Sequence, residues 1–352
     1  MTENTANTAS RKDEHMALAL DPLAQSQIDA GFDRVRLEHC ALPECDLAMI
    51  DVTTEFCGRP VSRPLFIGAM TGGTDRAMAI NLALAEMAES LQIGFAVGSQ
   101  RAALESGQTQ NALRAAAPSV PIIANLGGVQ LARPDGLALA QAAIDDLEAD
   151  AIAIHLNPLQ EAVQPEGDTD WRGVMAAVET AVHTLSAPVM VKEVGAGLSP
   201  SLVHQLGTAG VSIIDVAGLG GTNWTRIEAA RAPDAEIYAP FLDWGIPTVE
   251  ILTALCDQRR SLSDQSPYSI IASGGVRSGL DVAKAVWLGA DMVSMAGPVL
   301  TALVGARNGA PDVAAARHAV DVWTQQLTLA LFLTGAPDLG ALRHVAGQIA
   351  PV

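Results

Sequence analysis

Side chains that can do chemistry gather at the end of one short apolar segment. Ala151–Asn157 reads AIAIHLN, and its alternation of small and bulky residues predicts a strand with His155 and Asn157 on the small face. Gln160 and Glu161 follow within four residues. An imidazole, two amides and a carboxylate can orient a polar substrate and transfer protons. A lone histidine is more often a satisfied core residue, but these polar neighbours favour a functional site.

Glu161 begins an acidic stretch that also holds Glu166, Asp168 and Asp170. We interpret the last three as a solvated loop. Glu161 is a possible magnesium ligand, because one protein carboxylate, substrate phosphate oxygens and water together form a common Mg²⁺ site.

A lysine ends another predicted strand. Met190 and Lys192 share one face of Pro188–Val194, so Lys192 is expected to point toward the interior of the fold. A buried ammonium is costly unless it meets an anion or an electron-rich ligand. We therefore favour a ligand-binding role over a paired core lysine, the more so because the chain has only two other lysines, Lys12 and Lys284.

Two glycine-rich segments have the composition of a phosphate site. Ser273–Gly279 reads SGGVRSG and precedes a predicted helix, so backbone N–H groups and Arg277 could face one anion. Met295–Pro298 reads MAGP and follows the next predicted strand. Polar residues also stand at or after the ends of four other predicted strands: Thr71, Ser99, Arg101, Asn125 and Thr222.

Eight short apolar segments alternate with Ala- and Leu-rich helical patterns, and they must position these residues. The predicted strands are Pro64–Met70, Ala96–Arg101, Pro121–Leu126, Ala151–Asn157, Pro188–Val194, Ser212–Gly218, Ser269–Gly274 and Met292–Gly297. Such alternation predicts a parallel sheet, and eight units predict a (β/α)8 TIM barrel, an α/β fold whose site lies at the C-terminal ends of the strands. A doubly wound open sheet is the alternative; it is disfavoured because no G-x-G-x-x-G follows the first strand.

The domain prediction is a disordered tail at residues 1–10 and a single domain at 11–352. Within that domain we predict an N-terminal extension at 11–63 that contributes to the substrate site, the barrel at 64–300 and C-terminal helices at 301–352. Residues 224–266 are expected to contain an extra loop and helix. The most membrane-like stretch, Ala285–Ala306, is predicted as helix, turn, strand and turn, because Asp291 and Gly297-Pro298 interrupt it.

Composition excludes several classes of protein. With 49% apolar and 17% charged residues in 352, the chain is too apolar to be disordered. A net charge of −18 disfavours nucleic acid and anionic membranes as partners. The four cysteines, Cys40, Cys45, Cys57 and Cys256, form no C-x-x-C pair, and no secretory signal is visible, which predicts a cytoplasmic protein. We interpret Cys57 as an inert thiol.

Several motifs together carry a resemblance to a known family. They are Arg11-Lys12-Asp13-Glu14-His15, Met70-Thr71-Gly72-Gly73, Gly98-Ser99-Gln100-Arg101, Ala124-Asn125-Leu126-Gly127, His155-Leu156-Asn157-Pro158-Leu159-Gln160-Glu161, Val191-Lys192-Glu193, Gly220-Gly221-Thr222-Asn223-Trp224 and Ser273-Gly274-Gly275-Val276-Arg277. The set closely resembles type 2 isopentenyl-diphosphate isomerase from Arg11 to Gly297. The glycine loops are shared with other FMN-binding barrels, whereas Arg11–His15 and His155–Glu161 make the match specific.

The resemblance implies an FMN- and Mg²⁺-dependent enzyme that interconverts isopentenyl and dimethylallyl diphosphate. Reduced FMN would act as acid and base, NADPH would reduce it, and the chain would form a tetramer or octamer. FMN would be bound by the single domain at 11–352, through Ala69, Met70, Thr71, Ser99, Asn125, Lys192, Thr222, Gly275, Val276, Arg277, Ala296 and Gly297. The substrate would be bound by Arg11, Lys12, Ser99, Gln100, Arg101, His155, Asn157 and Gln160. Glu161 would hold the metal, and Gln160 and His155 are the predicted catalytic side chains.

Two other functions stay open at this point. An FMN-dependent 2-hydroxy-acid oxidase or dehydrogenase is expected to carry a histidine base near an arginine after a late strand, and none stands near the seventh predicted strand. A non-catalytic flavin-binding barrel would leave Arg11–His15 and Gln160-Glu161 without a role.

Overall fold

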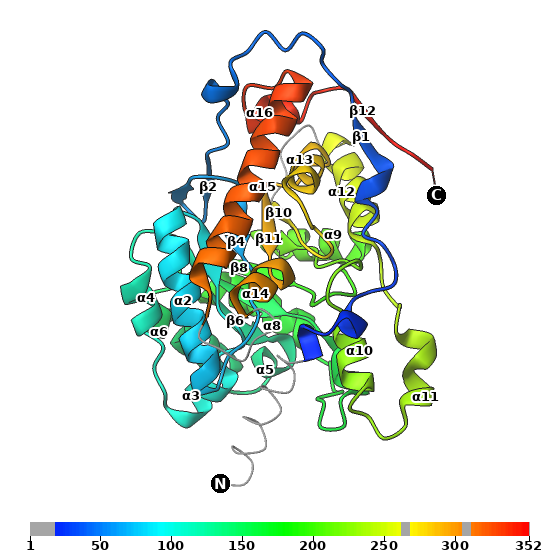
Figure 1. Ribbon diagram of the computed structural model, residues 1–352. Coiled ribbons are helices and arrows are strands. Elements are labelled where there is room, and N and C mark those ends of the chain that lie inside the picture. Colours follow the sequence, from blue (N-terminus) through cyan, green and yellow to red (C-terminus); the bar gives the residue numbers. More distant parts are fainter. Residues whose placement is uncertain (1–17, 262–267, 305–310, 352) are drawn as a thin grey trace.

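Eight parallel strands close into a barrel at the centre of the computed structural model, which describes residues 18–261, 268–304 and 311–351 (Figure 1). The strands are β4 (Leu65–Ile67), β5 (Gly94–Ala96), β6 (Ile122–Gly127), β7 (Ala151–His155), β8 (Val189–Lys192), β9 (Ile213–Asp215), β10 (Ser269–Ala272) and β11 (Met292–Met295). Each pairs in parallel with the next, and β11 pairs with β4. The predicted (β/α)8 barrel is confirmed, and the doubly wound alternative is wrong.

One predicted strand is misplaced along the chain. The second was expected at Ala96–Arg101, whereas β5 ends at Ala96. Beyond it the chain packs closely against the loop after β4, since a Cβ on Gly98 would lie 2.2 Å from the carbonyl oxygen of Thr71. Arg101 therefore begins helix α3 (Arg101–Ser106) and does not end a strand.

Alternating side chains separate the inside of the barrel from the outside. Ala151 and Ala153 of β7 and Met190 of β8 belong to the inner apolar cluster. Ile152 and Ile154 belong to the outer cluster, which includes the buried faces of the helices. The small face expected for β7 and the face that Met190 shares with Lys192 are thus confirmed.

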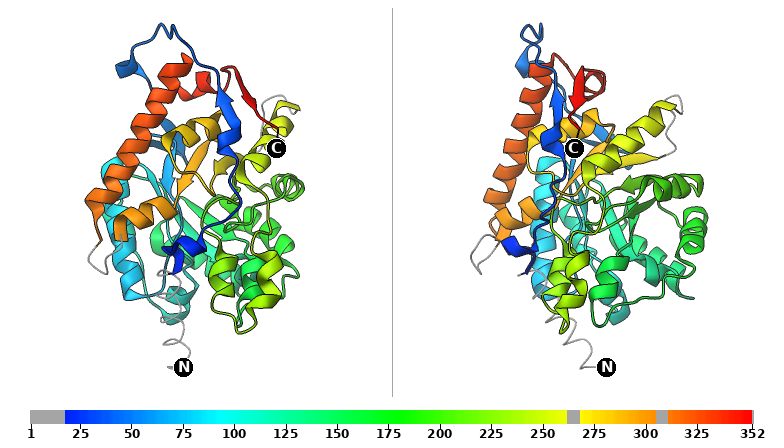
Figure 2. Two further views of the ribbon diagram at one scale, coloured as in Figure 1. Left: turned by 45° about the vertical axis from the view of Figure 1, so that its right-hand side comes forward. Right: turned by 90° about the vertical axis from the view of Figure 1, so that its right-hand side faces the viewer.

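Helices cover the outside of the barrel (Figures 1 and 2). Those that follow the strands in sequence are α2 (Asp75–Leu91), α3, α4 (Ala112–Ala116), α5 (Gly128–Leu131), α6 (Gly136–Leu147), α7 (Pro158–Val163), α8 (Val174–Thr184), α9 (Pro200–Thr208), α12 (Thr248–Ser261), α13 (Gly279–Trp287), α14 (Gly297–Val304) and α15 (Val313–Thr334). The predicted insertion between β9 and β10 is confirmed: it holds α10 (Trp224–Ala229), α11 (Ala235–Tyr238) and η4 (Ala239–Phe241) before α12.

The stretch Ala285–Ala306 is divided into separate elements, as expected, but a helix follows its strand where a turn was predicted. Helix α13 ends at Trp287, β11 follows, and Gly297-Pro298 begin α14 instead of forming a turn. Proline is tolerated in the first helical turn, where its missing N–H would have no partner. Among the described residues, no helix is long and apolar enough to cross a membrane.

A hairpin of β2 (Thr54–Phe56) and β3 (Arg59–Val61) closes the end of the barrel opposite the mouth. Phe56 and Val61 join the inner cluster, and Cys57 packs against it. Burial, with Asp150 nearby, raises the pKa of Cys57 to about 12, so this thiol stays protonated near neutral pH. This agrees with an inert thiol.

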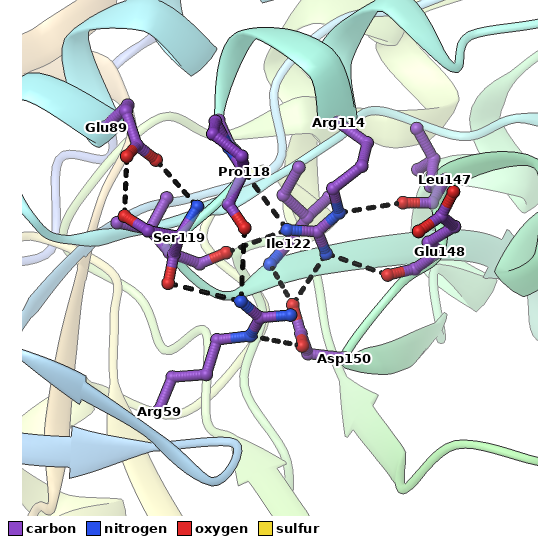
Figure 3. A network of polar contacts seen from close by, with 11 residues as sticks. Arg59, Glu89, Arg114, Pro118, Ser119, Ile122, Leu147, Glu148 and Asp150 are labelled. Carbon is purple, nitrogen blue, oxygen red and sulfur yellow. Dashed lines mark hydrogen bonds and ion pairs between the residues drawn. The ribbon is translucent and has the colours of Figure 1, made fainter.

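An ion-pair network holds this hairpin in place (Figure 3). The Asp150 carboxylate accepts hydrogen bonds from Arg59 Nε at 2.6 Å, Arg114 Nη2 at 2.7 Å and the Ile122 backbone N–H at 2.9 Å. Arg59 also donates to the carbonyl of Ser119. The network therefore joins the hairpin to the segments that lead into β6 and β7.

The two ends of the described chain pair with each other. Strand β1 (Val35–Leu37) is antiparallel to β12 (Gly347–Ile349). The remaining short elements are η1 (Pro22–Ala24), η2 (Phe32–Arg34), η3 (Leu47–Met49) and α16 (Leu339–Leu342). The N-terminal segment runs along the barrel from the mouth, at η1, toward the opposite end (Figure 2). The domain boundaries proposed above remain predictions.

Candidate active site at the barrel mouth

A pocket of about 770 Å³ opens at the C-terminal ends of the strands. Its lining includes every described residue predicted to bind FMN, and also Arg101, His155, Asn157, Gln160 and Glu161. Gln100 does not line it. Its buried amide donates to the Ala143 carbonyl at 3.3 Å and accepts from the Asn125 N–H at 3.0 Å, which makes it a packing residue. Arg11 and Lys12 lie outside the described residues.

Three neighbouring strands place one row of titratable side chains across the mouth. His155 of β7 is the register partner of Lys192 on β8, and Lys192 is the partner of Asp215 on β9. Burial, Lys192 and Arg101 lower the pKa of His155 to about 3, so its imidazole is neutral. His155 Nδ1 lies 2.8 Å from Asn125 Oδ1, which fixes the orientation of the ring.

Two buried carboxylates accompany Lys192. Burial raises the pKa of Glu193 and of Asp215, while the nearby ammonium acts in the opposite direction. The Glu193 carboxylate accepts the backbone N–H groups of Val194 and Gly195, both at 2.6 Å, so it shapes the loop after β8. Lys192 Nζ donates to the Glu193 carbonyl. The ammonium is held at the mouth, where it can meet an anionic ligand.

Asp215 links β9 to β10 through a serine. Ser273 Oγ donates to Asp215 and accepts the Ala217 N–H at 3.1 Å. Ala217 has a φ of +39°, a conformation that is strained for a residue with a Cβ. Ser273 thus holds a strained strand end in the pocket wall.

Glycine backbone forms much of the pocket wall. The lining glycines are Gly68, Gly72, Gly98, Gly195, Gly221, Gly274, Gly275 and Gly297. A Cβ on Gly275, where φ is +73°, would lie 2.6 Å from the Ala30 Cβ, so only glycine fits there. Arg277 Nη2 donates to the Gly220 carbonyl at 2.7 Å and ties the loops after β9 and β10 together. Bare backbone, Arg277 and the start of α14 suit a phosphate, and Lys192 suits an electron-rich ring, so these residues fit FMN.

The Glu161 carboxylate is oriented from both sides. Its Oε1 accepts from Asn157 Nδ2 at 2.9 Å, and its Oε2 accepts from the Asp168 N–H at 2.8 Å. Such support from neighbours is typical of metal-binding carboxylates. Among the described residues, no group of three or more His, Cys, Asp or Glu side chains forms a metal cage. A single carboxylate fits Mg²⁺ that is also held by substrate phosphates.

Gln160 contacts a carboxylate that we did not predict. Gln160 Nε2 donates to Glu228 Oε1 at 3.0 Å, and Glu228, on α10, is fully buried. Arg231 Nη1 lies 2.8 Å from Glu228 Oε2. The sequence offers no sign of this contact, because Glu228 lies in the insertion, 68 residues from Gln160.

Asp168 lies in a loop, as expected, and its side chain is 41% exposed, but it also has partners that the sequence did not predict. Its carboxylate lines the pocket and lies 3.8 Å from Arg101 and 3.4 Å from Arg133. Glu166 lines the pocket as well. Glu166 and Asp170 are exposed, as expected, and Asp170 pairs with Arg172.

Comparison with known proteins identifies the family. The FMN-dependent dehydrogenase family matches residues 159–346. A protein of Stutzerimonas stutzeri (strain A1501) named isopentenyl-diphosphate delta-isomerase is 47% identical over 342 residues, or 95% of both chains. The chain belongs to the isopentenyl-diphosphate delta-isomerase family. Another member of this isomerase family, from Chlorobaculum parvum (strain DSM 263 / NCIMB 8327), is 41% identical and covers 98% of both chains.

Solved structures show how far the barrel extends beyond the isomerase family. A mandelate oxidase variant with an FMN adduct has a TM-score of 0.67 at 19% identity and covers 96% of this chain and 92% of its own. A flavocytochrome b2 variant with pyruvate has a TM-score of 0.71 at 16% identity and covers 98% and 85%. At such identities the likeness shows the fold alone.

Proposed function

We propose that the protein interconverts isopentenyl and dimethylallyl diphosphate with FMN as cofactor. The observation that carries this proposal is the 47% identity, over 95% of both chains, to a relative named for that isomerisation. The pocket supports it, because glycine loops that suit a phosphate and a carboxylate that suits Mg²⁺ line the same cavity.

The acid and base of the reaction would come from the cofactor, since reduced FMN, once bound, would supply groups for proton addition to the unactivated alkene and for proton removal from it. The chain must bind, orient and shield. Lys192 would stabilise negative charge on the ring system, and Thr222 and Arg277 would hold the phosphate end.

The diphosphate of the substrate would lie between Arg101 and Glu161, with Mg²⁺ on the Glu161 carboxylate and Arg11 and Lys12 completing the clamp. Gln160 is proposed to hold or relay a proton; in support, it lines the pocket, its amide donates to Glu228, and it accepts from Asn157 Nδ2 at 3.1 Å. Neutral His155 would orient the substrate and serve as a hydrogen-bond partner.

The reductant, the location and the oligomeric state complete the proposal. NADPH is proposed as the reductant of the flavin because the resemblance to type 2 isopentenyl-diphosphate isomerase implies it. A cytoplasmic location agrees with the four cysteines, all of which are free. A tetramer or octamer is proposed on the resemblance to type 2 isopentenyl-diphosphate isomerase.

A 2-hydroxy-acid oxidase activity fits the pocket poorly. Among the described residues that line it, His155 is the single histidine. Its pKa of about 3 makes it a weak base, and it lies on β7, far in sequence from Arg277.

The experiment is an incubation of FMN-loaded protein with isopentenyl diphosphate and Mg²⁺ in deuterated water. One sample contains reduced flavin and a second contains oxidised flavin. We expect dimethylallyl diphosphate carrying deuterium in the reduced sample alone. Bound FMN without product or deuterium uptake would show a non-catalytic flavin protein. Net oxidation of lactate or glycolate would favour the oxidase.

A further inference from the structure

Asp168 contacts both charged parts of the proposed diphosphate site. Its Oδ2 lies 3.8 Å from Arg101 Nη1, 3.4 Å from Arg133 Nη2 and 3.3 Å from Gln130 Nε2. Its backbone N–H donates to Glu161 Oε2 at 2.8 Å. One residue therefore touches the arginine assigned to the diphosphate and the carboxylate assigned to Mg²⁺.

The loop that carries Asp168 is packed firmly against α7. A Cβ on Gly167 would lie 1.9 Å from the Glu161 carbonyl oxygen, so a side chain at this position would push the loop away. The Gly167 N–H also donates to the Gln164 carbonyl at 2.9 Å. These backbone contacts hold the Asp168 N–H against Glu161, and none of them involves the Asp168 side chain.

We propose that Asp168 is a positioning residue that makes the site select the magnesium complex of a diphosphate over the metal-free anion. This inference rests on the proposed function. Before substrate binds, the Asp168 carboxylate forms an ion pair with Arg101. A diphosphate that binds Arg101 must therefore displace the Asp168 carboxylate from the guanidinium. Arg133 then keeps Asp168 paired.

The negative charge of Asp168, which opposes binding of a bare diphosphate, favours binding of Mg²⁺. A carboxylate beside Glu161 attracts a divalent cation and repels a bare diphosphate. Arg101 and Asp168 are 33% and 41% exposed, so water screens their interaction. Exposed ion pairs of this kind correspond to about threefold in affinity, and we expect effects of that size.

The test is Asp168→Asn in the full-length, FMN-loaded protein, studied by calorimetry with inorganic pyrophosphate. Without Mg²⁺, the variant is expected to bind pyrophosphate about threefold tighter than wild type. With pyrophosphate present, its affinity for Mg²⁺ is expected to fall about threefold. Asp170→Asn is the matched control, because Asp170 is exposed and pairs with Arg172, and it should change neither value.

Arg133→Ala provides a second arm with the opposite sign. Without Arg133, Asp168 interacts more fully with Arg101, so metal-free pyrophosphate should bind more weakly than in wild type. A purely structural role for Asp168 would weaken both ligands in Asp168→Asn, and that result, or a change below 1.5-fold in both, would overturn the inference. If wild type itself binds pyrophosphate without any effect of Mg²⁺, the proposed clamp fails first and the inference fails with it.

Discussion

Asp150 gives the most quantitative prediction, because it stabilises the barrel at the end away from the chemistry. Replacing it by alanine removes the acceptor for Arg59, Arg114 and the Ile122 N–H (Figure 3). In TIM barrels this end contributes stability and the opposite end carries the site. Asp150→Ala should therefore lower the free energy of unfolding and leave FMN binding and turnover at 25 °C unchanged.

The magnitude follows from burial. Arg114 and Asp150 are 11% and 12% exposed, and breaking a buried ion pair costs about 3–5 kcal/mol. Arg114 would keep hydrogen bonds to the carbonyls of Leu147 and Glu148, which lowers this cost. Loss of the ion pair with Arg59, which is 33% exposed, costs at most about 1 kcal/mol. Loss of the hydrogen bond from the Ile122 N–H costs at most about 1 kcal/mol more. With the Arg114 contribution lowered by its remaining hydrogen bonds to about 1–2 kcal/mol, the three contributions total about 3 kcal/mol.

The assay is thermal unfolding at fixed FMN concentration and scan rate. With an unfolding entropy of about 2.1 cal/mol/K for each residue of a 352-residue chain, 3 kcal/mol corresponds to a Tm lower by about 4 °C. Asp170→Ala is the control, and its exposed pair with Arg172 predicts no measurable change. A shift below 1 °C in Asp150→Ala, or a loss of FMN affinity at 25 °C, would refute the reasoning.

Three further predictions concern the site. Glu161→Gln should raise the Mg²⁺ concentration for half-maximal activity at least tenfold and leave FMN affinity unchanged; loss of FMN would show that the metal site is misplaced. Lys192→Ala should weaken FMN binding about tenfold in a flavin fluorescence titration, since it removes a charge-assisted contact; normal affinity and normal reduction would exclude the ligand role. His155 has a pKa of about 3 in the folded protein and 6.5 in the unfolded chain, so the unfolded state binds more protons between those values. The free energy of unfolding should therefore fall as the pH drops from 6.5 toward 3, by about 1.4 kcal/mol per pH unit from this group. Denaturant unfolding between pH 7 and 4.5 should show that the unfolding free energy depends less steeply on pH in His155→Asn than in wild type.

The barrel was predictable because its pattern is local. Alternation within Ala151–His155 determines which side chains face the interior, and the same reasoning placed Met190 and Lys192 correctly. The predicted position of β5 was wrong because Gly98 packs against Thr71, a contact between two loops. The periodicity of the sequence does not indicate such contacts.

The unpredicted parts of the site depend on long-range contacts. Asp168 is a loop residue, as predicted, but its contact with Arg133, 35 residues away in the sequence, appears only in the folded chain. Asp215 gains its partner Ser273 from 58 residues away. Conversely, Gln100 belongs to one of the motifs that carry the resemblance, yet its amide donates to the Ala143 carbonyl in the core.

The pairing of β1 with β12 links the mouth of the barrel to the order in which the chain is synthesised. Arg34 Nε donates to the Ala350 carbonyl, 316 residues later. The segment before β1 reaches the mouth, where the Asn223 N–H donates to the Ala24 carbonyl at 2.7 Å. On the ribosome, a nascent chain can therefore fasten this segment to the mouth through Asn223 before it has made β12. The second attachment, at the opposite end of the barrel, forms only once β12 has been synthesised.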